Sequence, residues 1–237
     1  MRAIRLSRVI NPQTIALLGV LFINWLLFPG FFDITWQDGR LFGSMIDVLN
    51  RGVPVAILAI GMTAVIATKG VDLSVGAVMA IAGAVAATMV TVGYPGYVAV
   101  PTALAAALIC GLWNGILVTY LAIQPIVATL VLMVAGRGIA QLITEGSIVT
   151  FSDPTLIFIG TGSFLGLPMP VIIAAVLLAA SVIAVRSTAI GLFIEAVGVN
   201  RAAASLAGIH SRLLLVAIYT FSGLCAGMSG IIIAGDI

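Results

Sequence analysis

Long, unbroken apolar runs are the feature of this sequence that most limits the folds it can adopt. The stretch 73–93, for example, contains no charged residue, and about 20 consecutive apolar residues suffice to cross the hydrocarbon core of a bilayer. These runs do not alternate with period two, so they indicate helices rather than barrel strands. Only 8% of the residues are charged and 62% are hydrophobic, whereas a soluble domain carries about 25% charged residues. The sequence therefore predicts an integral membrane protein.

The apolar runs predict an all-α fold, a polytopic transmembrane helix bundle of about seven spans. The N-terminal run is interpreted as a retained first span, because bulky aromatic residues follow it where a signal peptide would have small residues at a cleavage site. The expected spans are 14–32, 48–68, 73–93, 97–120, 125–143, 168–186 and 211–235.

The distribution of Lys and Arg predicts that the N-terminus lies in the cytoplasm, because the cytoplasmic flanks of spans carry an excess of basic residues. With this orientation the polar segment 144–167 lies outside and is expected to hold a short interfacial helix. The segment 187–210 becomes the longest cytoplasmic connection. The cytoplasmic basic residues are Arg2, Arg5, Arg8, Lys69, Arg186, Arg201 and Arg212, against Arg40 and Arg51 outside.

The sequence also excludes several kinds of site. With a single histidine, His210, a multi-histidine metal site is excluded, and we expect no metal. No GxxxxGK[ST] motif occurs, so the chain has no P-loop of its own. Cys110 and Cys225 both fall inside apolar runs and are interpreted as small core residues. The net charge is only +2, and we expect no nucleic-acid partner.

The stretch "IATKGVDLSVGAVMA" (66–80) places charged residues between two apolar segments. In one interpretation it is a capped turn at the cytoplasmic surface, with Asp72 as the N-cap of the following helix and Ser74 supporting the same turn. In the other it is a broken helix in a transport path, because 53–68 is a short hydrophobic segment marked by Gly and Pro. Composition leaves both open. The residues assigned to this junction are Gly70, Asp72, Ser74 and Gly76.

Polar side chains within the spans are candidates for a transport path, because such groups are costly at bilayer depth. Arg137 either extends to the outer interface, where Glu145 could pair with it, or faces a polar conduit together with Gln141. Asn114 either bridges two packed helices or contacts a substrate. It lies between Gly111 and Gly115, and this GxxxG pair and a second one, Gly223 and Gly227, indicate close helix packing.

The cytoplasmic segment 187–210 predicts a helix–turn–helix elbow. Ser187 or Thr188 can cap a first short helix, Gly198 is expected to break it, Asn200 can cap a second, and Gly208 can end that one. The segment also carries apolar residues on a cytoplasmic connection, which favours docking against another protein. They are Leu192, Phe193, Ile194, Val197, Val199 and Leu206.

Three stretches of the chain resemble the membrane permeases of bacterial ATP-binding cassette (ABC) sugar importers of the ribose, xylose and galactofuranose type. They are "GMTAVIATKGVDLSVGAVMAIAGAVAA" (61–87), "CGLWNGILVTYLAIQPIVATLVLMVAGRGIAQLIT" (110–144) and "GLFIEAVGVNRAAASLAGI" (191–209). The stretch "QDGRLFGSMIDVLNRGVPVAILAIGMT" (37–63) is similar to the galactofuranose type in particular. The family has a glycine where this chain has Lys69, which weighs against a deeply buried turn there and favours a capped, tight junction near the cytoplasmic end.

The resemblance implies a permease subunit of the bacterial inner membrane, surrounded by lipid, that moves a monosaccharide such as galactofuranose by alternating access and is not an enzyme. The implied partners are a second permease chain, a cytoplasmic ABC ATPase and a periplasmic sugar-binding protein. No cofactor is expected in this chain, since ATP and Mg²⁺ would be bound by the ATPase. The expected conduit residues are Asn114, Arg137 and Gln141. The residues expected to contact the ATPase are Glu195, Ala196, Gly198 and Asn200.

Members of the family have about ten spans, so residues 1–237 are expected to form a single permease domain that is incomplete at its C-terminus. Two alternatives stay open. One is a secondary carrier or channel that works without ATP, against which stands the lack of an intramembrane carboxylate paired with Arg137. The other is an inactive truncated permease.

Overall fold

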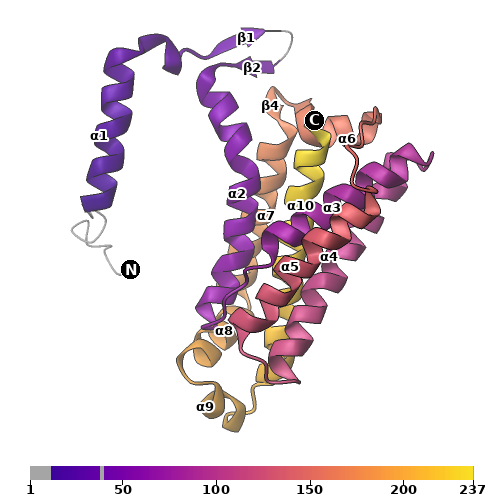
Figure 1. The fold of residues 1–237 in the computed structure, drawn as a ribbon. Coiled ribbons are helices and arrows are strands. Elements are labelled where there is room, and N and C mark those ends of the chain that lie inside the picture. The colour runs from indigo at the N-terminus through magenta and orange to yellow at the C-terminus, as the bar shows by residue number, and fades with distance from the viewer. Residues whose placement is uncertain (1–11, 38–39, 237) are drawn as a thin grey trace.

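The computed structural model describes residues 12–37 and 40–236, which form an all-α bundle with two short hairpins (Figure 1). Each of the seven predicted spans corresponds to a helix, so the predicted fold class is confirmed. These helices are α1 (Pro12–Leu27), α2 (Ser44–Ala67), α3 (Val75–Thr91), α4 (Gly96–Thr119), α5 (Pro125–Ile143), α7 (Met169–Ser187) and α10 (Ser211–Gly235).

Five of these helices, namely α2, α4, α5, α7 and α10, are long and apolar enough to cross a membrane. Helices α1 and α3 have 16 and 17 residues and are shorter than the spans expected for them. The 3-10 turn η2 (Pro29–Phe32) follows α1 closely, and Gly93, with a φ of +102°, follows α3. Helix α3 also begins later than expected, because the residues before it take a non-helical path through the bundle.

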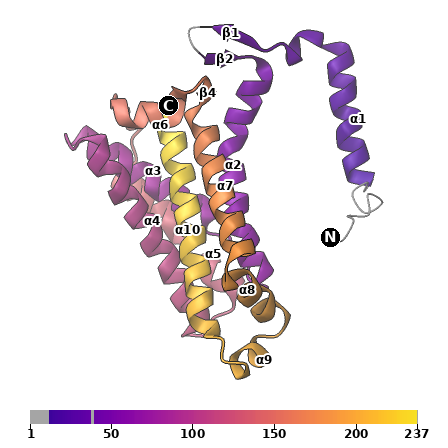
Figure 2. The same ribbon diagram turned by 180° about the vertical axis from the view of Figure 1, so that it is seen from behind.

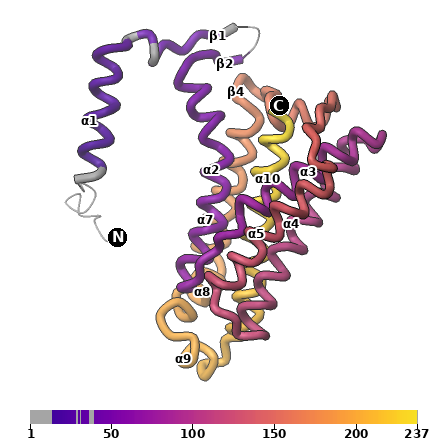
Figure 3. The backbone as a smooth tube through the Cα atoms, viewed as in Figure 1, coloured from indigo at the N-terminus to yellow at the C-terminus, as the bar shows by residue number. Residues whose placement is uncertain are grey.

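Helix α10 forms the centre of the bundle and packs against α2, α3 and α4 (Figure 2). Its buried residues include Ile218, Tyr219, Cys225 and Ile231, whereas Pro170 is the one fully buried residue among the described residues of α7. Helix α1 stands apart from the bundle and is joined to it through η2 and the first hairpin (Figures 1 and 3).

The contact between α4 and α10 depends on glycine, as the two GxxxG pairs predicted. A β-carbon added at Gly111 would lie 2.5 Å from the carbonyl oxygen of Tyr219, and one added at Gly223 would lie 2.6 Å from that of Ala107. Gly115 likewise lies against the backbone of Val216. The two helix backbones therefore approach too closely for larger residues at these positions.

One end of the bundle carries two antiparallel hairpins, β1 (Thr35–Gln37) with β2 (Arg40–Phe42) and β3 (Ser163–Phe164) with β4 (Leu167–Pro168). The short helix α6 (Pro154–Thr161) lies at the same end and confirms the short helix predicted within 144–167. Helices α8 (Ala189–Val199) and α9 (Arg201–Leu206) lie at the opposite end (Figure 1).

Asp153 fixes α6 to the start of α4. Its Oδ1 accepts hydrogen bonds from the backbone N–H groups of Thr155 (2.9 Å) and Leu156 (3.1 Å), and its Oδ2 accepts one from Gly96 (3.1 Å). Burial raises the pKa of this carboxyl, but the N–H donors of Leu156, Gly96 and Thr155 outweigh that effect, so the pKa is lowered from its ordinary value of 3.8.

Candidate functional site: a helix break with a buried carboxylate

The chain between α2 and α3 is a helix break inside the bundle. Helix α2 ends at Ala67, Lys69 has a left-handed φ of 60°, residues 70–74 are non-helical, and α3 begins at Val75. Gly70 is buried at the bend, where an added β-carbon would lie 2.7 Å from the hydroxyl of Tyr219. The tube in Figure 3 shows α2 and α3 on either side of this break. This geometry favours the broken-helix interpretation over a surface turn.

Asp72 is the centre of a buried hydrogen-bond network in this break. The carboxylate is 3% exposed. Its Oδ1 accepts from the backbone N–H (3.0 Å) and the hydroxyl (2.6 Å) of Ser74, and its Oδ2 accepts from the hydroxyl of Ser222 (2.8 Å). The amide of Asn114 donates to the Ser74 hydroxyl at 2.8 Å. Each of these hydrogen bonds is donated toward the carboxylate, directly or through the Ser74 hydroxyl.

The network lies about half-way along the bundle. Ser222 is near the middle of α10 (Ser211–Gly235), and a rise of 1.5 Å per residue puts it roughly 16 Å from the start of that helix. The expectation that Asp72 lies near the cytoplasmic end was therefore wrong. Asp72 is also not the N-cap of α3, a position held by Ser74. The carboxylate is stabilised instead by the two donors of Ser74, by the hydroxyl of Ser222 on α10, and by the positive end of the α3 dipole.

The backbone of the break is held by side chains from two further directions. The carbonyl oxygen of Val71 accepts hydrogen bonds from the hydroxyls of Tyr219 and Thr129, both at 3.4 Å. Tyr219 is on α10 and Thr129 is in the first turns of α5. The break therefore contacts α4, α5 and α10, so a shift of residues 70–74 would change the contacts of all three helices.

The sequence reasoning did not select Tyr219, Ser222 or Thr129 as site residues. Tyr219 and Ser222 are spaced i, i+3, which puts them on one face of a helix, and polar residues sharing a face in an apolar span are a signal that could have found them. Thr129 carries no comparable signal, because threonine is common in apolar helices. Its contact depends on where the break passes α5.

Asn114 connects α4 to the break through its hydrogen bond to Ser74. It is fully buried, and its Oδ1 has no hydrogen-bond partner among the described residues. Arg137 and Gln141 do not lie beside Asn114. Both are exposed on α5, whereas Gly136 and Ala140 of the same helix are buried. No ion pair within 4 Å joins Arg137 to Glu145 in the described structure.

The predicted helix–turn–helix elbow is present as α8 and α9. The hydroxyl of Thr188 accepts from the N–H of Ile190, and Asn200 Oδ1 accepts from Ala202 (3.0 Å) and Ala203 (3.1 Å). Gly208, with a φ of +89°, follows α9 as predicted. Gly198 does not break the first helix, which continues to Val199.

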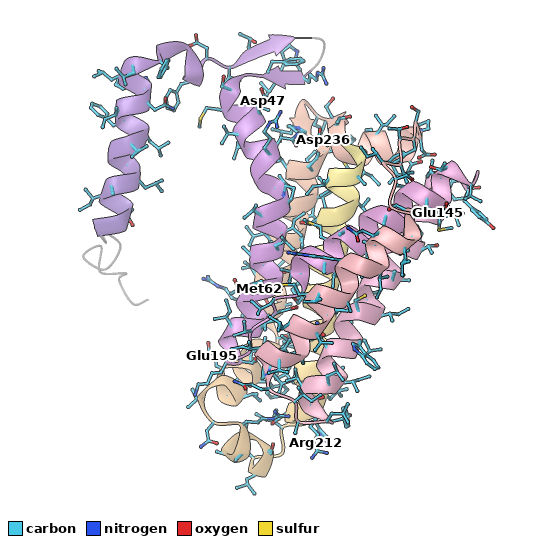
Figure 4. The ribbon with its side chains drawn as sticks, viewed as in Figure 1. Asp47, Met62, Glu145, Glu195, Arg212 and Asp236 are labelled. Carbon is cyan, nitrogen blue, oxygen red and sulfur yellow. The ribbon has the colours of Figure 1, made fainter. Side chains whose placement is uncertain are left out.

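Gly198 instead brings α8 against the end of α2. A β-carbon added there would collide with the carbonyl oxygen of Ala67. Beside this contact, Lys69 Nζ donates to the carbonyl oxygen of Val199 at 3.1 Å. Glu195 is exposed, Ala196 is half-buried, and Glu195 lies at the end of the bundle opposite Asp47 and Glu145 (Figure 4). The elbow is therefore joined directly to the helix break.

Comparison with known proteins finds similarity to permeases of transport systems. Residues 44–236 match a family described as branched-chain amino acid transport system / permease component. The galactofuranose transporter permease protein YtfT of Escherichia coli (strain K12) is 58% identical over 95% of this chain and 66% of its own length. The fructose import permease protein FruF of Bifidobacterium longum is 38% identical over 85% of this chain and 58% of its own.

The ribose import permease protein RbsC of Haemophilus influenzae is 35% identical over 92% of this chain and 67% of its own length. The chain thus spans about two thirds of the length of these relatives, or somewhat less. No solved structure matches it.

Proposed function

The chain belongs to the family of branched-chain amino acid transport system permease components, and from that premise we propose that it is the permease subunit of an ABC importer for a monosaccharide. It is a multi-pass inner-membrane protein, with five helices long and apolar enough to span the bilayer. The observation that carries the proposal is the junction of the α8–α9 elbow with the helix break at 68–74.

In the proposed mechanism, motion of α8 moves the break and thereby the spans around it. Gly198 packs on the end of α2, and Lys69 Nζ holds the last carbonyl of α8. Three residues further on, Asp72 is bonded to Ser222 of α10. A displacement of the elbow would thus reach the middle of the bundle through a short stretch of chain, which is what alternating access requires of a cytoplasmic coupling element.

The partners belong to the same proposal. A cytoplasmic ABC ATPase would bind ATP and Mg²⁺ and contact the elbow through Glu195, Ala196, Gly198 and Asn200. A periplasmic sugar-binding protein would deliver the sugar, and a second permease chain would complete the path. This subunit itself would carry out no chemistry and hold no cofactor, so we assign it no enzymatic activity.

A monosaccharide is the substrate class that the names of the relatives support, with galactofuranose favoured by the 58% identity. A neutral sugar suits a conduit with few charges. Asn114, Arg137 and Gln141 remain the proposed conduit residues. Because Arg137 and Gln141 are on an exposed face of α5, their role would require that face to line the path against the second permease chain.

A secondary carrier is the alternative that one observation favours. Ion-coupled carriers place ionisable groups near the bilayer midplane, beside broken helices, and Asp72 is such a group. Both oxygens of its carboxylate, however, are already engaged by protein donors. The ABC importer and the secondary carrier differ in the energy source that drives uptake, which is ATP in the first and an ion gradient in the second.

The ATPase contact is tested by substitution of Glu195. Glu195→Arg reverses an exposed charge on α8 and should at least halve co-purification of the ATPase, while membrane insertion is unchanged. Arg186→Glu, which reverses an exposed charge on neighbouring α7, is the matched control and should leave co-purification intact. Gly198→Arg is a poorer probe, because it would also displace the end of α2. Normal ATPase binding by Glu195→Arg would contradict the assignment.

A further inference from the structure

A cavity of about 740 Å³ opens at the α8–α9 end of the bundle, beside the helix break. It lies between the end of α2, the connection from α4 to α5, the elbow, and the start of α10. Three basic side chains line it, Lys69, Arg201 and Arg212, and none of the described lining residues is acidic. The cavity therefore has a positive potential that no group in its own wall offsets.

The rest of the lining suits a ligand with a polar head and an apolar body. Thr119, Ser205 and Ser211 form the polar part of this lining, with the Thr119 hydroxyl donating to the carbonyl oxygen of Gly115 and the Ser205 and Ser211 hydroxyls bonded to each other. Val118 and Leu215 contribute apolar surface beside them.

The cavity lies at the depth of a membrane surface. Arg212 is in the first turn of α10, and its guanidinium lies 5.9 Å from the ring centre of Tyr120, at the end of α4. Tyr120 and Trp113 are both more than half exposed. Exposed Tyr and Trp next to the basic end of a span are typical of the interface between lipid headgroups and water.

We propose that this cavity binds a phosphate-bearing anion, namely the headgroup of an anionic phospholipid from the cytoplasmic leaflet. Basic pockets between transmembrane helices on the cytoplasmic side are suited to such headgroups. Arg201 and Arg212 bind the phosphate, with Lys69 at the inner end, and the apolar surface lies alongside the acyl chains. Because Lys69 also bonds Val199 of α8, a bound lipid would hold the elbow against α2. The proposal rests on the cavity alone and does not depend on the transported substrate.

Native mass spectrometry of the purified chain tests this, with phosphatidylglycerol or phosphatidylcholine added to the detergent micelles. We expect one phosphatidylglycerol to be retained in preference to phosphatidylcholine. The double variant Arg201→Gln/Arg212→Gln should retain it about thirtyfold more weakly, which corresponds to about 2 kcal/mol. Arg186→Gln, which removes a basic residue from the same end but outside the cavity, should behave as the wild type. If the double variant does not fold, the two single variants replace it, and each is expected to retain phosphatidylglycerol about fivefold more weakly.

Three results would overturn the proposal. Equal retention of the two lipids would show no preference for an anionic headgroup. Equal loss in Arg186→Gln would show a general attraction of lipid to the basic end of the protein. Stabilisation against heat by inorganic phosphate alone, lost in the double variant and without phosphatidylglycerol retention, would mean that the ligand is a soluble phosphate compound and not a lipid.

Discussion

At the scale of single residues, Asp72 holds the non-helical segment within the bundle. Its carboxylate accepts three hydrogen bonds from Ser74 and Ser222. Such bonds to a charged group contribute about 1.5–3 kcal/mol each, and an unpaired buried donor is costly. Asp72 therefore contributes much of what fixes residues 70–74, beside the bonds that Tyr219 and Thr129 donate to Val71.

We predict that Asp72→Ala lowers the free energy of unfolding by about 3 kcal/mol or more, because the hydroxyls of Ser74 and Ser222 lose their acceptor. The measurement is unfolding by denaturant in detergent, together with the fraction of folded chain in size-exclusion chromatography. Asp47→Ala, an exposed carboxylate in the first turn of α2, is the control and should cost less than about 1 kcal/mol. Unchanged stability and uptake in Asp72→Ala would contradict this role.

We predict that Lys69→Gly is tolerated. Lys69 has a φ of 60°, a conformation that glycine adopts without steric cost, and the hydrogen bond of its side chain, to Val199, is exposed. The expected change in unfolding free energy is within about 1 kcal/mol. Lys69→Val, which keeps a side chain but is β-branched, should be clearly less stable than Lys69→Gly. The reverse order would show that the left-handed conformation is not what matters at this position.

We predict that the attachment of α6 depends on pH. The folded-state pKa of Asp153 is lowered from 3.8, so its contribution to stability is fully present above that ordinary value and is lost as the pH falls through the folded-state pKa. The protection of the Thr155 and Leu156 amides against hydrogen exchange, relative to their intrinsic exchange rates, should therefore fall only in acid. Asp153→Asn should remove most of this pH dependence, and an unchanged profile in that variant would assign it to another group.

At the scale of elements, the α4–α10 contact is the close helix packing that the two GxxxG pairs predicted. Gly111 and Gly223 occupy positions where an added β-carbon would meet the backbone of the other helix, so any larger side chain forces the helices apart. Overpacking of this kind costs about 1–3 kcal/mol or more.

We predict that Gly111→Leu prevents normal folding or lowers stability by at least about 3 kcal/mol. Gly138→Leu is the matched control, because a β-carbon at Gly138 meets nothing within 4 Å and leucine is a better helix former than glycine. Thermal unfolding in detergent should show a lower transition temperature for Gly111→Leu and no lowering for Gly138→Leu. Equal effects of the two would contradict the packing argument.

The positions of the helices could be predicted from the sequence because length and apolarity determine them locally. The caps at Thr188 and Asn200 were predictable for the same reason. The depth of Asp72 was not, since it depends on Ser222, which is 150 residues away along the chain. The helical continuation through Gly198 was not predictable either, because packing against Ala67 outweighs the low helix propensity of glycine.

At the scale of the whole molecule, the elbow, the helix break and the core helix α10 form one continuous path of contacts. Lys69 bonds the elbow at Val199, Asp72 bonds Ser222, and Val71 bonds Tyr219. This arrangement supports a permease in which force applied at the cytoplasmic end moves the centre of the bundle. The resemblance in the sequence indicated the family, and contacts between distant residues supply the route by which the force would travel.

The most direct test of this account is sugar uptake by proteoliposomes that contain the chain together with the proposed ATPase and sugar-binding protein. The account predicts that uptake of labelled galactofuranose requires ATP on the ATPase side and is unchanged when proton and sodium gradients are collapsed. Uptake that continues without ATP and stops when an ion gradient is removed would contradict it, and would assign Asp72 to ion coupling instead.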